Sequence, residues 1–391
     1  MTGKKCVILF FLVSFSIPLF AQRVAQPWWL SLEQGKIKYR SGDYGAALLL
    51  FEDARRDRRA MFEQMERDLI NLLSINEVRR LGDSLEKVEK YSYDRYYTAA
   101  SAALQELYYR IPKASLYNSA SAALEALGKL KDYPEAEYWI GEVYRAEGEL
   151  PLALAQYRKA NELRDILEDS GFSTALQYKI AALLRTRQDY NEMEKVLLYI
   201  INDLDTLWVN ARRQEGGESA SGKVPVPYAQ ASASFATQAM TRTLENEGIA
   251  RFMELYRYNN GKVEQAHRLL GFHYAATGRP SAQQHLMFAF LIQNTTIIDE
   301  IKRKEFDFTF TNLQTLTEYI NKNALLLSYV EDVEYYKTAY YLGASLYRNG
   351  KTTVAREFWN FLSSQPQAGE WYSRAFMQLR NPHLEPVVEM P

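Results

Sequence analysis

The sequence is almost devoid of cysteine, because Cys6 is the only one in 391 residues. One cysteine cannot form an intrachain disulfide or supply a cysteine-based zinc site. Histidine is also scarce, and no two histidines are three or four residues apart, so no helix face offers two imidazole ligands. The histidines are His267, His273, His285 and His383. We therefore predict neither disulfides nor a metal site.

An excess of charge of either sign is absent as well. The chain has 47 basic and 48 acidic residues, which give a net charge of −1. This balance provides no overall field that would favour nucleic acid or an anionic membrane surface. Hydrophobic residues make up 47% of the chain, which is enough for a large folded body and too much for a disordered protein. We expect no nucleic-acid partner.

Membrane-spanning runs are also missing. The segment from Val7 to Phe20 has about fourteen residues, whereas a transmembrane helix needs roughly 20. Two lysines precede it and the small Ala21 follows it, which predicts a cleaved secretory signal over residues 1–21, with an uncleaved anchor as the alternative. A lipoprotein needs its cysteine directly after the apolar run, and Cys6 precedes it. We therefore expect a periplasmic protein that does not insert into a membrane after cleavage.

Pairs of glycines seven residues apart recur along the chain. They are Gly35 and Gly42, Gly141 and Gly148, Gly271 and Gly278, and Gly343 and Gly350. Each pair is followed by a small alanine and then by a large side chain four residues later, as in Ala47 and Phe51. We predict that the first glycine lets another helix approach closely and that the second ends a helix in the left-handed conformation. The alanine marks a helix crossing.

This pattern resembles the tetratricopeptide repeat, with its W-x2-L-G-x2-Y segment followed by A-x3-F and a further alanine. The matching segments begin near Trp28, Pro134, Glu264 and Tyr336, with a weaker one near Thr174, and cover about half of the predicted mature chain. The resemblance implies an all-α solenoid of tetratricopeptide-like helical hairpins. A single hairpin cannot bury its apolar face, so the copies must stack. Because they are not contiguous, we expect an irregular array.

The predicted organisation follows from the segments between these copies. Residues 22–211 form an N-terminal helical array, and residues 235–380 form a C-terminal one. Between them, residues 212–234 are rich in Gly, Ser, Ala and Pro, which predicts a long flexible loop. Residues 381–391 contain three prolines and no helical period, which predicts an extended tail.

No motif supports catalysis or a cofactor. The stretch from Gly217 to Val224 nearly matches a phosphate-binding loop, but Val224 stands where that loop needs Ser or Thr, and the V-P-V-P that includes it cannot begin a helix. No serine or histidine lies in a nucleophile motif. We therefore predict no enzymatic activity and no cofactor.

In tetratricopeptide proteins the first helix of each hairpin lines a concave surface that binds partners. Aligning the copies on their glycines predicts Tyr and Arg side chains on this surface, which are the types that carry most interface energy. The predicted groove residues are Tyr39, Arg40, Tyr138, Arg145, Tyr178, Arg185, Arg268, Tyr340, Tyr347 and Arg348. The alternative is that they are ordinary solvated helix faces.

The leading interpretation is a periplasmic scaffold or adaptor that binds other proteins of the cell envelope, in a secretion, cell-wall or flagellar-motor assembly. Exported tetratricopeptide proteins include members of the periplasmic flagellar collar of spirochaetes, with which the chain is compatible. Two alternatives stay open. One is a binding protein for a small hydrophobic or glycan ligand, and the other is an α-solenoid enzyme such as a lytic transglycosylase. The latter needs an isolated Glu of raised pKa in a deep cleft. The sequence leaves the oligomeric state open.

Overall fold

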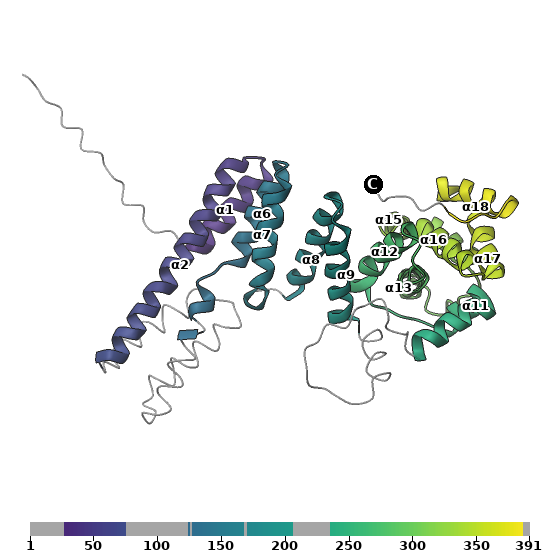
Figure 1. Cartoon of the computed structure of the whole chain (residues 1–391), viewed down its shortest axis with the longest axis horizontal. Coiled ribbons are helices and arrows are strands. Elements are labelled where there is room, and N and C mark those ends of the chain that lie inside the picture. Colours follow the sequence, from purple (N-terminus) through teal and green to yellow (C-terminus); the bar gives the residue numbers. More distant parts are fainter. Residues whose placement is uncertain (1–26, 76–123, 126, 168–169, 206–234, 386–391) are drawn as a thin grey trace, which may run out of the picture. The chain divides into compact units, whose positions relative to one another are not determined.

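The computed structural model of the chain describes residues 27–75, 124–125, 127–167, 170–205 and 235–385 (Figure 1). These residues form helices and no strand, so the predicted all-α class is confirmed. Among the described helices, none is both long enough and apolar enough to cross a bilayer. The predicted signal peptide and the predicted loop at 212–234 lie outside the described residues. Compact packing divides the chain into two units, between Glu147 and Gly148.

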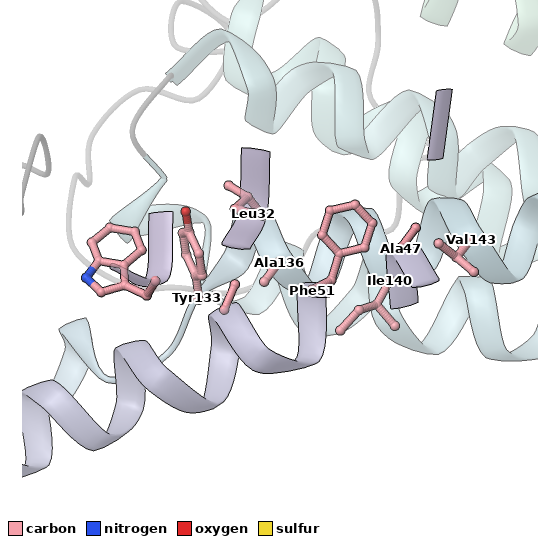
Figure 2. Packing of buried hydrophobic residues seen from close by; sticks show 9 residues of the cluster. Leu32, Ala47, Phe51, Tyr133, Ala136, Ile140 and Val143 are labelled. Atoms are coloured by element: carbon pink, nitrogen blue, oxygen red, sulfur yellow. The ribbon is translucent and has the colours of Figure 1, made fainter. Parts of the chain in front are cut away.

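The first unit contains helices α1 (Trp28–Arg40), α2 (Tyr44–Ile75) and α6 (Pro134–Ala146). α1 and α2 form a hairpin, and α6 packs against α2. Their shared core consists of Trp28, Leu32, Ala47, Phe51, Ala54, Tyr133, Ala136, Ile140 and Val143 (Figure 2). The large ring of Phe51 fits only because its neighbour on α1 is small, since a Cβ on Gly35 would lie 2.5 Å from that ring. The first predicted repeat is therefore a tightly packed hairpin.

The second unit contains three further hairpins. They are α8 (Ser170–Thr186) with α9 (Tyr190–Leu204), α12 (Gly261–Ala276) with α13 (Ala282–Lys304), and α16 (Tyr335–Arg348) with α17 (Thr352–Leu362). The second helix of each hairpin packs against the first helix that follows it in this series: α9 on α12, α13 on α16, and α17 on α18 (Glu370–Arg380). Each hairpin thus covers its neighbour's apolar face.

Other helices complete this unit. α7 (Leu150–Glu162) packs on α8, and the short helices α14 (Leu313–Asn321) and α15 (Ala324–Asp332) pack on each other. α11 (Phe235–Leu255) lies against α17 and α13. Gly248, with a φ of 84°, interrupts α11, and the Glu357 carboxylate accepts from the N–H of Ile249 beyond this break at 3.1 Å. The short helices η1 (Arg164–Ile166) and η3 (Pro366–Ala368) follow α7 and α17.

The predicted close approach is confirmed at Gly35, Gly271 and Gly343, and the predicted left-handed conformation is confirmed at the second glycine of all four pairs. A Cβ on Gly271 would lie 2.6 Å from Leu286 Cγ, so only glycine allows this approach of α12 and α13. The second members of the pairs, Gly42, Gly148, Gly278 and Gly350, all have φ between 70° and 84°. In the weak copy, Gln188 takes this position with φ of 60°. The crossing alanines, Ala47, Ala153, Ala282 and Ala355, are at most 2% exposed.

Candidate functional site

The predicted groove residues fall into three groups in the structure. Tyr39, Arg40, Tyr138 and Arg145 belong to the first unit. Tyr178, Arg185 and Arg268 lie around α12, and Tyr340, Tyr347 and Arg348 lie on α16. In each group, side chains contact carboxylates or backbone groups of the same chain, and the repeat pattern does not predict these partners.

In the first unit, the two tyrosines are packing residues more than free contact groups. The ring of Tyr39 stands edge-on to Trp139 at a centroid distance of 5.4 Å, and Tyr138 is only 7% exposed. Burial, together with the nearby Glu142 carboxylate, raises the pKa of Tyr138. Arg145 is exposed, and its guanidinium lies 2.9 Å from Glu142. Arg40, at the end of α1, is exposed.

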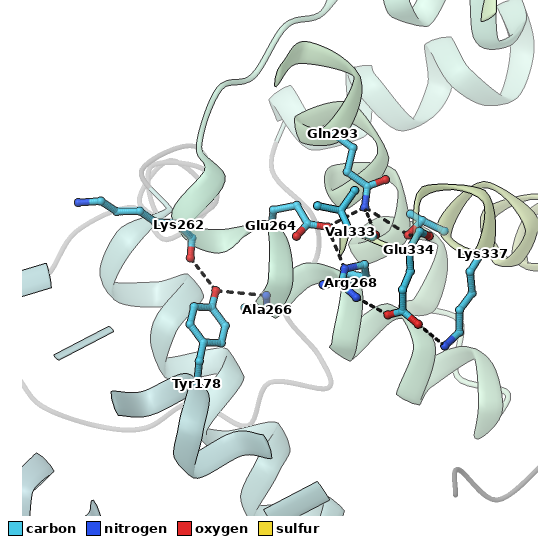
Figure 3. Close-up of polar contacts among 10 residues, drawn as sticks. Tyr178, Lys262, Glu264, Ala266, Arg268, Gln293, Val333, Glu334 and Lys337 are labelled. Carbon is cyan, nitrogen blue, oxygen red and sulfur yellow. Dashed lines mark hydrogen bonds and ion pairs between the residues drawn. The ribbon is translucent and has the colours of Figure 1, made fainter. Parts of the chain in front are cut away.

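Around α12, Arg268 is 7% exposed and joins a network of ion pairs (Figure 3). Its Nε donates to Glu264 Oε1 at 3.0 Å, and its Nη1 donates to the Glu334 carboxylate. The Glu334 carboxylate also accepts from Lys337 Nζ at 2.7 Å. Gln293 of α13 adds a third helix, because its Nε2 donates to Glu264 Oε1 at 2.7 Å. Arg268 therefore links α12 to α16 by contacts internal to the chain.

The two carboxylates of this network differ in their electrostatics. Burial raises the pKa of Glu264, against the opposing effect of Arg268 and Gln293. Burial also acts to raise the pKa of Glu334, but Lys337, Arg268 and Arg185 outweigh it and leave this pKa below its ordinary value. Arg185 is exposed, so it is the member of this group whose guanidinium faces solvent.

Tyr178 connects α8 to the beginning of α12. Its hydroxyl donates to the carbonyl oxygen of Lys262 at 2.6 Å and accepts from the N–H of Ala266 at 3.3 Å (Figure 3). Both backbone groups belong to α12, which begins at Gly261, and they lie four residues apart on one side of the helix. The hydroxyl thus joins two successive hairpins, and burial raises its pKa.

On α16, the predicted residues contact the chain's own C-terminal segment. Residues 382–385 adopt neither helix nor strand. Arg348 Nη2 donates to the carbonyl oxygen of Glu385 at 3.0 Å, and the Tyr347 hydroxyl donates to that of Pro382 at 3.4 Å. The Tyr340 hydroxyl donates to the Glu385 side chain. The three residues predicted to bind a protein segment on α16 therefore hold one here.

Sequence reasoning missed two residues of this site, Arg374 and Gln378 on α18. Arg374 Nη2 donates to Glu385 Oε2 at 2.6 Å, and Gln378 Nε2 donates to Oε1 at 3.1 Å. Gln378 Oε1 also accepts from the N–H of His383 at 2.9 Å. α18 carries no repeat signature, so the alignment on glycines assigned it no inward face. The i, i+4 spacing of Arg374 and Gln378, which puts both on one helix face, was the available signal.

A cavity of about 490 Å³ lies beside this site. Trp371 belongs to both, because it lines the cavity and its ring lies 5.4 Å from that of Tyr340. The remaining lining residues come from α15, from the beginning of α16 and the residue before it, from η3 and from the first residue of α18: Leu327, Val330, Glu331, Glu334, Tyr335, Tyr336, Lys337, Gln367, Ala368 and Glu370. The cavity combines aromatic walls with several carboxylates.

A buried polar chain connects α12, α13 and the end of α9. His267 Nδ1 lies 3.0 Å from His285 Nδ1, and His267 Nε2 lies 3.0 Å from Asp205 Oδ2. The Tyr258 hydroxyl donates to Asp205 Oδ1 at 2.6 Å. Burial, with a further contribution from His267, holds the pKa of His285 well below its ordinary value.

This buried histidine predicts a loss of stability in mild acid. Below pH 6.5, the ordinary histidine value, unfolded chains take up a proton at residue 285 that folded chains do not. Stability therefore falls as the pH drops, by about 1.4 kcal/mol per pH unit for one such group. His273, whose pKa is lowered by burial and by Arg279, acts in the same direction. Urea unfolding between pH 7 and 5.5 measures the slope.

Two variants distinguish the contribution of His285 to this pH dependence from the contributions of other titrating groups. The His285→Gln variant is expected to lose much of the slope, whereas the His383→Gln variant, which changes an exposed histidine, keeps it. An unchanged slope in His285→Gln would contradict the assignment.

No metal centre or isolated acid emerges from the described part of the chain. There, no cluster of three or more His, Cys, Asp or Glu side chains has the geometry to hold a metal ion. Glu264 is a carboxylate of raised pKa, as a glycosidase acid requires. However, Arg268 and Gln293 both donate to its Oε1, and it is not among the residues that line the cavity. Glu264 is thus held by two donors within the chain.

The chain is similar to two proteins that are both uncharacterised. No family model matches the chain. An uncharacterised protein of Treponema pallidum is 24% identical over 363 residues, which cover 91% of this chain and 90% of the relative. An uncharacterised protein of Borreliella burgdorferi is 22% identical over 275 residues, which cover 69% of this chain and 84% of the relative. The chain is thus similar to these proteins over most of its length.

Proposed function

We propose that the chain is a non-enzymatic, tetratricopeptide-like scaffold that binds extended segments of other proteins. The hairpin packing supports this proposal. In the second unit, each hairpin covers the next through its second helix, and a helical glycine sits at close approach in the first helix of two of them, α12 and α16. This is how a stack of helical repeats buries its core.

One observation carries the proposal: residues 382–385, which form neither helix nor strand, contact α16 and α18 through backbone groups as well as through the Glu385 side chain. Tyr347 and Arg348 donate to its carbonyl oxygens. Backbone contacts of this kind can accept segments of different sequence, as adaptor proteins do. The occupant here is residues 382–385 of the same chain.

The partner is proposed to be an envelope protein, because the sequence predicts export to the periplasm. The two relatives come from spirochaetes, the group in which exported tetratricopeptide proteins build the flagellar collar. A role in such an assembly is the specific form of the proposal.

Photo-crosslinking in the host cell tests the scaffold function. A photoreactive amino acid replaces Ala344, which is half-buried on α16 close to Arg348, or, as the control, the exposed Lys302 near the end of α13. We expect a discrete adduct with an envelope protein from position 344 and not from position 302. Identical adduct patterns from both positions, or no adduct from either, would contradict the proposal.

The cavity favours one second candidate, a binding protein for a glycan. Aromatic rings such as Trp371 and Tyr336 can stack on sugar rings, and the nearby carboxylates can accept from sugar hydroxyls. Soluble cell-wall fragments that raise the melting temperature of the full chain, but not of a Trp371→Ala variant, would favour this candidate over the scaffold.

A further inference from the structure

We propose that the site formed by Tyr340, Arg374 and Gln378 recognises a glutamate side chain within an extended segment of a partner protein, and that residues 382–385 are an internal competitor for it. This inference rests on the proposed scaffold function and specifies the chemistry of the partner. We infer the chemistry of the partner segment from the contacts that residues 382–385 make in this site.

The carboxylate of Glu385 is bound by three different donors. Arg374 takes Oε2 at 2.6 Å, while Gln378, at 3.1 Å, and the Tyr340 hydroxyl share Oε1. Every neighbour of the carboxylate in this set is a donor, so a glutamine in its place would turn its amide N–H groups toward Arg374 or Tyr340. A neutral phenol is required for donation, and burial, reinforced by Glu385, keeps Tyr340 in that form by raising its pKa. The site therefore selects a carboxylate over its neutral amide.

The main donor, Arg374, is also held by aromatic rings of the fold. The Arg374 guanidinium lies 4.7 Å from the ring centroid of Tyr340 and 4.9 Å from that of Trp371. Stacking on aromatic faces orients the planar guanidinium before a carboxylate arrives. With the segment in place, Gln378 is completely buried, and its amide contacts both Glu385 and His383. Such preorganisation reduces the entropic cost of binding and is typical of a recognition site.

The remaining contacts are hydrogen bonds to the backbone of the segment. Besides the carbonyl groups of Pro382 and Glu385, the N–H of His383 is bound, by Gln378 Oε1 at 2.9 Å. The side chain of Leu384, in contrast, is 58% exposed, and His383 is exposed as well. A segment of any sequence that places a glutamate at this position can therefore make the same contacts.

The exposure of Leu384 also indicates that the internal segment is a weak ligand. Its contacts are polar, and it buries little apolar surface, which is the main source of affinity for peptides. Being attached to α18, it needs little affinity, because a short tether gives an effective concentration in the millimolar range. A partner segment that inserts an apolar side chain into the neighbouring cavity at Trp371 gains the burial that residues 382–385 lack. It can then displace the internal segment.

The test uses the full chain and a fluorescein-labelled, amidated peptide with the sequence of residues 378–385. Its binding is measured by fluorescence polarisation. The Glu385→Gln variant removes the internal carboxylate, so we expect it to bind the peptide about tenfold more tightly than the unmodified chain. Adding Tyr340→Phe or Arg374→Met should remove this gain, and a peptide with Gln in place of Glu should not bind. Circular dichroism and melting temperatures check that each variant is folded.

Each other outcome overturns the inference. Because the segment is a weak ligand, the chain is titrated into the millimolar range, and an absence of binding by Glu385→Gln there would show that the site does not take a glutamate segment. Equal binding by Glu385→Gln and the unmodified chain would show that residues 382–385 do not compete. Concentration-dependent dimers of the chain would identify a second copy as the occupant. If the crosslinked envelope protein of the scaffold test is captured unchanged by Arg374→Met, the scaffold stands and the glutamate site fails.

Discussion

Replacing Arg268 by alanine is expected to lower the free energy of unfolding by about 3–5 kcal/mol, the usual cost of removing one partner of a buried ion pair. Arg268 is 7% exposed and Glu264 is 5% exposed, so the substitution leaves a buried carboxylate without its cation. The loss should be smaller in mild acid, because burial already raises the pKa of Glu264 and a protonated carboxyl needs no counter-ion. Urea unfolding followed by circular dichroism measures the change.

Two further variants show whether the loss comes from the unpaired charge. Arg185→Ala, which removes an exposed arginine from the same group, is expected to change stability by at most about 0.5 kcal/mol. Combining Arg268→Met with Glu264→Gln removes the buried charge as well as its partner and should recover much of the loss. If Arg268→Ala and Arg185→Ala were equally stable, Arg268 would be an ordinary surface residue and a better candidate for partner binding.

The Gly271→Ala variant is expected to lose about 1–3 kcal/mol of stability by overpacking the contact between α12 and α13. A methyl group there would lie 2.6 Å from Leu286 Cγ and 3.2 Å from the backbone nitrogen of Leu286. Side-chain rotation relieves the first clash but not the second, so the two helices must move apart. Thermal unfolding should show a lower melting temperature with the helical content preserved.

The same helix offers a matched control. Gly261, at the beginning of α12, has no atom within 4 Å of the position of a Cβ. Gly261→Ala is therefore expected to be neutral or to stabilise by up to about 1 kcal/mol, because alanine restricts the unfolded chain more than glycine does. Equal effects of the two substitutions would mean that helix propensity, and not close packing, explains the glycine pattern.

The predictable part of the fold rests on local steric rules. Glycine at Gly35 or Gly271, and alanine at Ala47 or Ala355, are needed because another helix passes within contact distance. Such requirements recur at fixed spacing in the sequence, so helical hairpins and their crossing points could be predicted from it. The position of Gln188 shows the limit of the pattern, because its φ of 60° marks a turn that no glycine announces.

The candidate site was less predictable because its residues acquire their roles from partners far away in the chain. Arg268 pairs with Glu334, 66 positions later, and Tyr340 with Glu385, 45 positions later. With 47 basic and 48 acidic residues, the sequence offers too many charge combinations for such pairs to be identified. The type of residue on α16 could be predicted from the repeat, but its occupation by residues 382–385 could not, because tail docking leaves no periodic trace.

The packing of α11 has a consequence for how the second unit opens. Helices that contact only their neighbours in chain order can fray one after another from the ends. α11 instead contacts α17, and Glu357 reaches the N–H of Ile249 across 108 positions of sequence. Opening of α17 therefore also releases α11. The helices from α11 to α17 are thus expected to open together, as one cooperative segment. We expect amide hydrogen exchange from α11 to α17 to require this concerted opening. In α7 and α8, which lie outside this segment, we expect exchange through smaller, local fluctuations.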